Sequence, residues 1–451
     1  MGEERERQEE DRERREEGRG RERQTALWVY RPRCVLPREM NPSWGKLREG
    51  VAREVETPTF AIDWQHMERF CEWKSTRKSD RVYRGEEAHQ KLVEYKAENL
   101  RSREGKGTPG YTAKDVAVNE CFSNTIPALS FMGPGRARTP QERGTRPHQG
   151  SPEENSVMIA RALRLMGAAA VGFVELQDET TRKLIYLEEE KDGPQTIFED
   201  VEVGYETPQK RVIPRRAAWV IVYSIPMSGL GLAQAPSPLS RGTTMQAYVR
   251  LYTIYNQLHE FIRALGYHSY GATIMNGFGI YPAFAVLGGI GEQCRIDTVI
   301  SPEYGSMMRL AAMATDLPLA ATLPISMGVR EYCARCRICS RYCLSGAISS
   351  ADEPGWIPQG PWSNPGHEAY FRRTMRCRDM FYRTGSNCGV CIARCPFSEP
   401  DPAKYREFLA KVPEMAAGHI PLAEPLPVSR DPENWWERKD GPELDIASRY
   451  L

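Results

Sequence analysis

The chain has 451 residues, with 61 Lys and Arg against 60 Asp and Glu, so its formal net charge is +1. This length allows two or three domains with a sizeable core. The balanced charge gives no general attraction to nucleic acid or to an anionic membrane. No apolar run is long enough to span a bilayer, because the nearest candidate, 217–225, has the length of a strand. We therefore expect a soluble protein whose partners must be argued from particular sites.

The N-terminal third is predicted to be irregular. Residues 1–24 alternate Glu and Arg almost without apolar side chains, so they cannot offset the entropy of ordering and are predicted to be disordered. No apolar stretch follows the Arg pair at 14–15, as a twin-arginine export signal would require. Residues 25–150 predict a wrapping region with a short strand at 58–64, a helix from Gln65 and an amphipathic helix at 86–100.

Residues 151–329 predict a mixture of helices and strands. Ser151 supplies an N-cap, Pro152 the first helical position and Glu153 an acidic first turn, so a helix is predicted over 153–166. Segments rich in β-forming residues predict strands at 170–176, 182–187, 217–223 and 297–300. Apolar spacing of i, i+3 and i+4 predicts a helix over 244–265, ended by Gly266. Without a regular βαβ repeat, the predicted fold class is α+β.

Eight of the 12 cysteines gather in residues 330–400, at the spacing of iron–sulfur ligands. In the bacterial ferredoxin pattern, three cysteines of a run hold one [4Fe–4S] cluster and the fourth reaches across to the other. The first predicted ligand set is Cys333, Cys336, Cys339 and Cys395; the second is Cys343, Cys377, Cys388 and Cys391. Leu344 stands where the pattern has Pro, and Cys377 lies well upstream of its partners. Residues 401–451 predict a tail with one short helix.

Structural zinc and disulfides are the alternatives for these cysteines. Zinc ribbons pair short Cys motifs around one tetrahedral ion, whereas three cysteines at successive two-residue spacing with a distant fourth suit a cubane better. Disulfides are disfavoured because no secretory signal is visible and the cysteines cluster at metal spacing. Both ligand sets therefore predict iron–sulfur chemistry and the movement of electrons.

Segments spread over residues 55–397 resemble the catalytic subunit of corrinoid-dependent reductive dehalogenases. Singly they are weak motifs, and their order and spacing make the match specific. Besides both cysteine runs, they are Pro58-Thr-Phe-Ala-Ile-Asp-Trp64, Ser151-Pro-Glu-Glu-Asn-Ser156, Arg182-Lys-Leu-Ile-Tyr186, Phe261-Ile-Arg-Ala-Leu-Gly-Tyr267, Gly289-Ile-Gly-Glu292, Pro302-Glu-Tyr-Gly305 and Thr315-Asp-Leu-Pro-Leu319.

This resemblance implies a nitroreductase-like corrinoid-binding core at 151–329, with an inserted unit near 177–215, and a ferredoxin-like domain at 330–400. It implies a base-off cobalamin between that domain and a buried pocket, where one cluster reduces cobalt to Co(I) and halide is removed from an organohalide. The corrinoid carries the difficult redox step, and the protein supplies orientation, electrons and a proton.

The resemblance also implies catalytic roles for Tyr248 as proton donor, Arg309 beside it and Asn276 as a steadying residue. A phenol titrates near pH ~10, and a neighbouring guanidinium favours the phenolate, which makes the phenol a better acid. From residues alone, Tyr248 would be a packing residue of a helix stripe. Gly289 and Gly291 could cradle the corrinoid, or simply form a tight turn.

Three further side chains were weighed for the same site. His259 is not expected to be a lower cobalt ligand, because the family binds its corrinoid without a protein imidazole. Trp362 and Tyr382 could grip an apolar halogenated substrate or pack around the clusters.

The implied partners are a small halogenated organic substrate and a low-potential donor such as ferredoxin or flavodoxin. The absent export signal predicts a cytoplasmic location; with a misassigned start, the outer face of the cell membrane and an anchor partner become the alternative. A related alternative function is epoxyqueuosine reductase, which acts on tRNA and would favour a basic face and a catalytic Asp. A second alternative is an electron carrier without an active site of its own. It is disfavoured because the roughly three hundred residues before the cysteine runs would then have no function.

Overall fold

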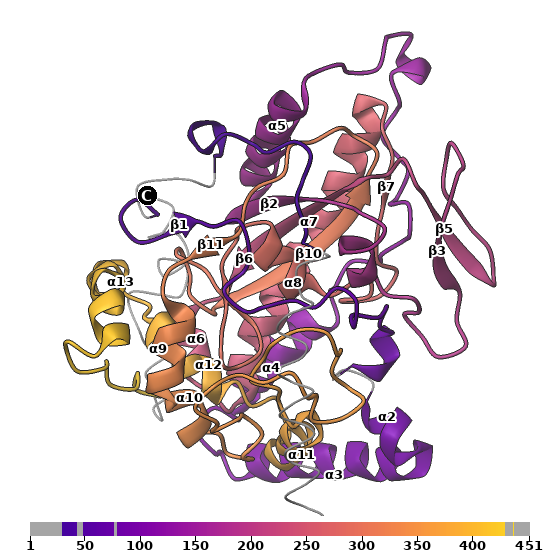
Figure 1. Cartoon of the computed structure of the whole chain (residues 1–451). Helices are drawn as coiled ribbons and strands as arrows, with labels where there is room; N and C mark the ends of the chain where they lie inside the picture. The colour runs from indigo at the N-terminus through magenta and orange to yellow at the C-terminus, as the bar shows by residue number, and fades with distance from the viewer. Residues whose placement is uncertain (1–28, 43–47, 76–78, 429–435, 437–451) are drawn as a thin grey trace, which may run out of the picture.

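The computed structural model describes residues 29–42, 48–75, 79–428 and 436, so the prediction for 1–24 lies outside the described part. It is a mixed helix and sheet fold (Figure 1). The helices are α2 Ser79–Arg84, α3 Glu86–Gly105, α4 Ala113–Ser123, α5 Pro152–Met166, α6 Gly229–Leu232, α7 Pro238–Leu265, α8 Tyr281–Leu287, α9 Val329–Cys336, α10 Ile338–Arg341, α11 Thr374–Thr384, α12 Val390–Ala393 and α13 Pro402–Ala417. Short 3₁₀ turns are η1 Arg38–Met40, η2 Glu72–Lys74, η3 Gln141–Arg143, η4 Thr181–Leu184 and η5 Pro396–Ser398.

The strands form one central sheet and three small ones. The central antiparallel sheet has the order β2-β6-β10-β7, the second sheet has the order β3-β5-β4, and β1 pairs with β11 and β8 with β9. Their bounds are β1 Arg53–Glu54, β2 Ala170–Glu175, β3 Gln195–Glu199, β4 Tyr205–Glu206, β5 Lys210–Pro214, β6 Trp219–Pro226, β7 Ser269–Tyr270, β8 Glu292–Gln293, β9 Val299–Ile300, β10 Met308–Thr315 and β11 Ile325–Ser326.

The central sheet is covered on both faces. On one face, the Tyr223 hydroxyl donates to the Leu251 carbonyl of α7 at 2.7 Å. On the other, Gly288 at the end of α8 packs against Gly172 and Val222. Because successive strand residues point to opposite faces, α7 and α8 lie on opposite sides of the sheet. This explains why β2, β6 and β10 are almost entirely buried.

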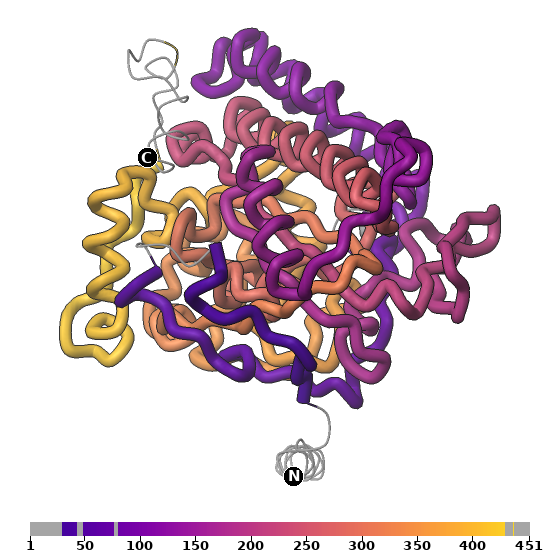
Figure 2. The backbone as a smooth tube through the Cα atoms, turned by 90° about the horizontal axis from the view of Figure 1, so that it is seen from above, coloured from indigo at the N-terminus to yellow at the C-terminus, as the bar shows by residue number. Residues whose placement is uncertain are grey.

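The second sheet and the C-terminal helix lie at opposite sides of the molecule. In Figures 1 and 2, β3 and β5 project on one side while α13 lies on the other, next to the cysteine-rich helices. The β3-β5-β4 sheet lies inside the inserted unit predicted at 177–215. Within the described residues, none of the helices combines the length and apolar character needed to cross a membrane.

Several predicted elements are present where the sequence indicates them. Helix α5 has the Ser151 capping box and Pro152 at its start, and α7 ends at Gly266 in the left-handed conformation. Helix α7 begins at Pro238, earlier than the predicted residue 244, because the Ser237 hydroxyl caps the Ser240 amide. The predicted helix in residues 401–451 is α13.

Two predicted elements are wrong. No helix begins at Gln65, because the Asp63 carboxylate accepts the amides of Gln65 and His66 and closes a turn. The segment 182–187 is not a strand but largely the 3₁₀ turn η4, since the Thr181 hydroxyl donates to the carbonyl of Glu175 at 2.6 Å and bends the chain directly after β2. The predicted strand at 58–64 is reduced to a single bridge between Ile62 and His367.

Candidate active site

The three predicted catalytic residues lie together. Asn276 Nδ2 donates to the Tyr248 hydroxyl oxygen at 3.2 Å, and the Arg309 guanidinium lies 5.3 Å from the centre of the Tyr248 ring. Tyr248 comes from α7, Arg309 from β10 and Asn276 from the loop after β7. All three line one cavity, which we call the inner cavity, of about 800 Å³ including its open mouth. Elements far apart in sequence therefore converge on one phenol.

Tyr252 fixes the orientation of Asn276. Its hydroxyl accepts the Asn276 amide N–H at 2.7 Å and donates to Oδ1 at 3.3 Å, which leaves Nδ2 to face Tyr248. The Tyr248 and Tyr252 rings are stacked one helical turn apart, with centroids separated by 6.0 Å. Asn276 itself has φ of +62°, a conformation that Asn tolerates better than most residues. Tyr252 therefore holds the site in addition to packing in the core.

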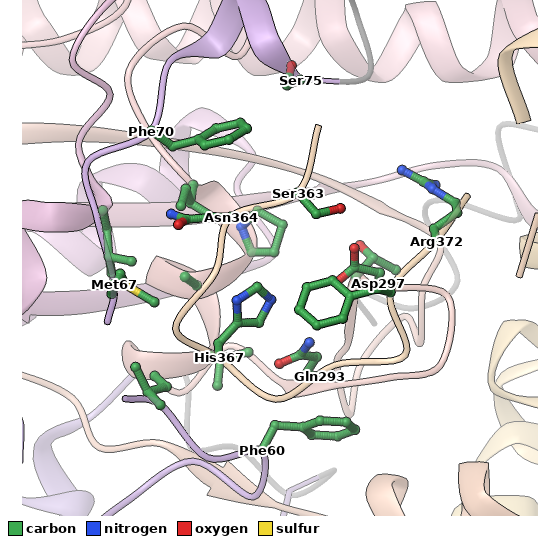
Figure 3. Close-up of a pocket in the computed structure, with 18 of the residues that line it drawn as sticks. Phe60, Met67, Phe70, Ser75, Gln293, Asp297, Ser363, Asn364, His367 and Arg372 are labelled. Atoms are coloured by element: carbon green, nitrogen blue, oxygen red, sulfur yellow. The ribbon is translucent and has the colours of Figure 1, made fainter. Parts of the chain in front are cut away.

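A second cavity, here called the outer cavity, adjoins the inner one. It encloses about 1140 Å³ including its mouth, and both cavities share Ser75, Tyr186, Pro282 and Thr298 in their walls. Figure 3 shows the side chains of Phe60, His367 and Asp297 around its open space.

Two distant segments close the wall of the outer cavity. The amide of Asp63 donates to the Gly366 carbonyl at 2.8 Å, and the amide of Glu368 donates to the Ala61 carbonyl at 2.9 Å. Gly366 has φ of +86°, and a Cβ there would come within 2.5 Å of the Met67 backbone nitrogen. The contact between residues 61–67 and 366–368 is therefore too close for any side chain at position 366.

Buried polar atoms face the outer cavity without a protein partner. Among the described residues, Asn364 Oδ1 and His367 Nδ1 are buried without a hydrogen bond, and both residues line the cavity (Figure 3). Such atoms normally pair with a ligand or water, because leaving them unsatisfied costs about 1–3 kcal/mol each. A large ligand with amide or carboxylate side chains, as a corrinoid has, fits this lining.

The eight predicted ligand cysteines fall into two groups. Burial, followed by repulsion from Cys339 and Cys333, raises the pKa of Cys395 well above the ordinary thiol value. Burial, followed by repulsion from Cys388 and Cys377, raises the pKa of Cys391 to about 12. For Cys395 and Cys391 the two strongest repelling thiols belong to the same predicted set, whereas Cys339 is repelled by Cys333 of its own set and then by Cys391 of the other. Within the described residues, no group of three or more His, Cys, Asp or Glu side chains is placed to hold a single metal ion.

The first cysteine group is organised by the hairpin of β8 and β9. The buried Glu292 carboxylate accepts the amides of Met327, Val329 and Arg330, which fixes the start of α9 and hence Cys333. Arg295, 1% exposed, donates twice to the Cys333 carbonyl, at 2.9 and 3.0 Å. Its other hydrogen bonds also go to carbonyls, and within the described part of the chain it has no carboxylate partner.

The second cysteine group lies beside the outer cavity. Arg372 lines that cavity, and although burial would lower its pKa, the charges of Cys377, Asp297 and Cys391 raise it. Burial would likewise raise the pKa of Cys343, but hydrogen bonds from Ser345 and nearby amides lower it. The order is therefore cysteine groups, outer cavity and then the inner cavity with Tyr248.

Other predicted residues lie away from the cavities. Gly289 and Gly291 line neither, and a Cβ on either would come within 2.2 Å of the carbonyls of Leu323 or Ile300, so their absent side chains serve backbone packing. His259 is buried against Ser269 and lines neither cavity. Trp362 does line the outer cavity. Tyr382 instead donates a hydrogen bond to Asp80 at 2.8 Å.

Sequence reasoning missed several contributors. Tyr252 could have been found from its position one turn after Tyr248 on the same helix face. Arg295 and His367 carry no such local signal, because only the fold brings them to the first cysteine group and to the outer cavity. Cys294 lies outside both cysteine runs, yet the pKa of its thiol is raised by burial and then by the neighbouring Cys333.

Comparison with known proteins shows which family the chain resembles. Residues 123–319 match the family model described as reductive dehalogenase subunit. The chain is 31% identical over 268 residues to the tetrachloroethene reductive dehalogenase of Sulfurospirillum multivorans, covering 56% of this chain and 52% of that protein. It is 29% identical over 303 residues to the chloroethene reductive dehalogenase of Dehalococcoides mccartyi strain VS, covering 59% and 55% respectively. The chain thus spans about half the length of the curated relatives it matches.

Solved structures share the fold. The catabolic reductive dehalogenase NpRdhA matches with a TM-score of 0.61 and 22% identity over 85% of this chain and 49% of that chain. Another reductive dehalogenase, whose structure is described as suggesting a mechanism for B12-dependent dehalogenation, matches with a TM-score of 0.59 and 20% identity over 92% of this chain and 52% of its own.

The resemblance predicted from the sequence is confirmed: the chain is related to the catalytic reductive dehalogenases. An epoxyqueuosine reductase from Listeria monocytogenes serovar 1/2a is 24% identical over 138 residues, covering only 30% of this chain and 33% of that protein. That match is weaker and more partial, so it does not displace the first assignment.

Proposed function

We propose that the protein is a reductive dehalogenase that removes halide from a small organohalide, using a corrinoid and two [4Fe–4S] clusters. The observation that carries this proposal is the inner cavity, in which Tyr248, Asn276 and Arg309 meet. Support comes from the family match and from the relatives named as reductive dehalogenases. The reaction balances as R–X + 2 e⁻ + H⁺ → R–H + X⁻.

The finer architecture belongs to the same proposal. The core is nitroreductase-like, the segment 330–400 is a double-cluster ferredoxin-like domain, and the ligand sets are those derived from the cysteine spacing. The repulsion of Cys395 by Cys339 and Cys333, and of Cys391 by Cys388 and Cys377, supports these sets. The predicted domain boundaries and a cytoplasmic location are part of the proposal too.

Tyr248 is the proton donor. Because Asn276 Nδ2 donates to the phenol oxygen, the phenol's own O–H remains free to face a substrate in the inner cavity. The same donor would stabilise the phenolate after the proton has left. Arg309 adds a positive charge beside the ring, and within the described residues its Nε has no hydrogen-bond partner. Both neighbours therefore favour the charge that develops on Tyr248.

The outer cavity is the proposed corrinoid site. A corrinoid there would supply the low-potential cobalt centre at which the carbon–halogen bond is broken. Asn364 and His367 would pair with its polar side chains, while Phe60 and Met67 would cover apolar surface. Arg372, between the cavity and the second cysteine group, would place positive charge along the route of the electrons.

The test uses the purified full chain, reconstituted with iron, sulfide and hydroxocobalamin under anoxic conditions. With titanium(III) citrate as reductant, we expect halide release from at least one member of a panel of chlorinated, brominated and fluorinated ethenes and phenols. Bound cobalamin without halide release from any compound, together with reduction of an epoxyqueuosine-containing tRNA stem-loop, would refute the assignment.

A further inference from the structure

A basic surface lies directly outside the two cysteine groups. We define it as the basic patch, formed by Arg341, Tyr342, Leu344, Arg376 and Arg394. The Arg394 guanidinium lies 4.4 Å from the centre of the Tyr342 ring. Arg376 extends to within 3.9 Å of the position that a Cβ on Gly346 would occupy. Arg376 and Arg394 therefore both reach the segment 341–346, which carries the other three residues of the patch.

The positive charge of the patch is not neutralised within the described residues. The ion pairs of this part of the chain use other arginines, namely Arg330 with Glu368, Arg337 with Asp352, and Arg378 with Asp80. No carboxylate pairs with Arg341, Arg376 or Arg394 among the described residues.

Two apolar side chains lie exposed among these charges. Tyr342 is 39% and Leu344 is 53% exposed. Leu344 takes the place of the Pro that usually follows the fourth cysteine of a ferredoxin run. Tyr and Arg, which both occur in this patch, are enriched at protein–protein interfaces relative to the rest of the surface.

The patch is close to the predicted cluster ligands. Arg341 donates to the carbonyl of Cys336, a ligand of the first set, at 3.1 Å. Tyr342 and Leu344 flank Cys343, a ligand of the second set, and Arg394 directly precedes Cys395. A protein docked here would bring its own redox centre as near to the clusters as this side of the chain permits.

We propose that the basic patch is the docking surface for a small acidic electron-carrier protein of low potential. This inference rests on the proposed function, because it concerns the delivery of the two electrons that each halide removal consumes. The carrier is oxidised by one electron per encounter and a cluster is reduced by one, so two encounters support one turnover. Complementary charge would speed the encounter and make it sensitive to salt.

The experiment compares wild type with the double variant Arg376→Glu/Arg394→Glu. Binding of a purified acidic ferredoxin is measured by calorimetry at low and high salt, with a basic carrier of similar size as the control protein. We expect the variant to bind the ferredoxin at least ~10-fold more weakly at low salt and to lose most of the salt dependence. Arg383→Glu, on an exposed residue at the far end of α11, is the matched control and should bind like wild type.

Electron transfer provides the second measurement. Bleaching of the cluster absorbance by reduced ferredoxin should slow in the double variant, while bleaching by titanium(III) citrate should not. Neither measurement needs a halogenated substrate. A result that refutes the docking surface can therefore be distinguished from one that refutes the proposed function. If iron content falls in the double variant, Arg376→Gln/Arg394→Gln replaces it.

Three outcomes would overturn the proposal. The first is unchanged ferredoxin binding in the variant. The second is an equal loss with both reductants while the clusters stay intact. The third is a wild-type dimer that the variant dissociates, because the patch would then join two copies of this chain.

Discussion

Among the described residues, the Tyr248 hydroxyl has one hydrogen bond, from Asn276, and it lies in the wall of the inner cavity. Replacing it with Phe removes the proton and leaves the ring packed on Tyr252. General acids contribute about 10²–10⁴-fold to rate. We therefore expect Tyr248→Phe to lose at least ~100-fold in halide release while binding cobalamin and iron like wild type. Normal turnover by this variant would show that the proton comes from elsewhere.

Tyr252 acts through Asn276, so removing its hydroxyl should reduce halide release less than removing the Tyr248 hydroxyl does. Tyr252→Phe removes the hydroxyl that both accepts from and donates to Asn276. With Asn276 free to rotate, the Tyr248 phenolate loses a stabilising donor, and the pH at which halide release declines should rise. A pH profile of kcat for the two variants checks this, and a profile identical to wild type would assign Tyr252 to packing alone.

His259 makes the stability of the chain depend on pH. Burial lowers its pKa from 6.5 to about 3, so the folded protein keeps it neutral while the unfolded chain takes up a proton below pH 6.5. Its contribution is therefore fully present above pH 6.5 and is lost as the pH falls, at up to about 1.4 kcal/mol per pH unit. The free energy of unfolding, measured with urea, should differ less between pH 7.0 and pH 5.5 in His259→Gln than in wild type.

At the level of residues, the sequence predicts those residues that belong to a recognisable motif and few others. The cysteine runs and the Tyr248, Asn276 and Arg309 constellation follow from spacing and from a family resemblance. Asn364 and His367, which line the outer cavity, lie in sequence between the two cysteine runs. No local pattern marks them, because their role is created by the fold alone.

At the level of elements, the β8–β9 hairpin is the most informative feature. It carries Glu292, which fixes the start of α9, and Arg295, whose buried charge has no carboxylate partner among the described residues. A buried charge without an opposite charge is costly, so the cluster proposed for the first cysteine group would be its natural counter-charge. Arg295→Met should therefore lower the reduction potential of the first cluster, because a positive neighbour that favours the added electron is removed.

This prediction is checked by potentiometric titration followed by electron paramagnetic resonance. Arg337→Met is the control, because Arg337 is in the same cysteine segment but pairs with Asp352 at the surface. Equal potentials in wild type and Arg295→Met, with iron content unchanged, would contradict the role given to Arg295. A loss of iron in the Met variant calls for Arg295→Lys, which keeps the charge and should restore the potential.

Elements were predictable where local signals were strong. Caps and periodicity identified α5 and the C-terminal end of α7. Strand β10 was not predicted, because its alanines and methionines have little preference for strands, and its position is fixed by pairing with β6 instead. The strand predicted at 182–187 is wrong for the opposite reason. Its residues favour a strand, but the hydrogen bond from the Thr181 hydroxyl to the Glu175 carbonyl bends the chain there.

At the level of the whole molecule, the two ligand sets have different consequences when one ligand is lost. Cys336→Ala removes a ligand of the first set only, and the second set has no member in α9. We expect about half of the iron to remain after reconstitution, with the clusters of the second set still reducible. Iron and acid-labile sulfide analysis measures this. An unchanged iron content would refute the assignment of Cys336, and complete loss would mean that neither cluster forms without the other.

The wall of the outer cavity is formed by two segments that are synthesised at different times. Residues 61–67 leave the ribosome early, whereas the residues that pair with them, 366–368, come near the end of synthesis. Until then the cavity is open on that side, and afterwards backbone hydrogen bonds hold it shut. A large cofactor is therefore enclosed most readily by a chain that is still completing its fold. Apoprotein that has already folded should take it up slowly, at the rate at which this closure reopens.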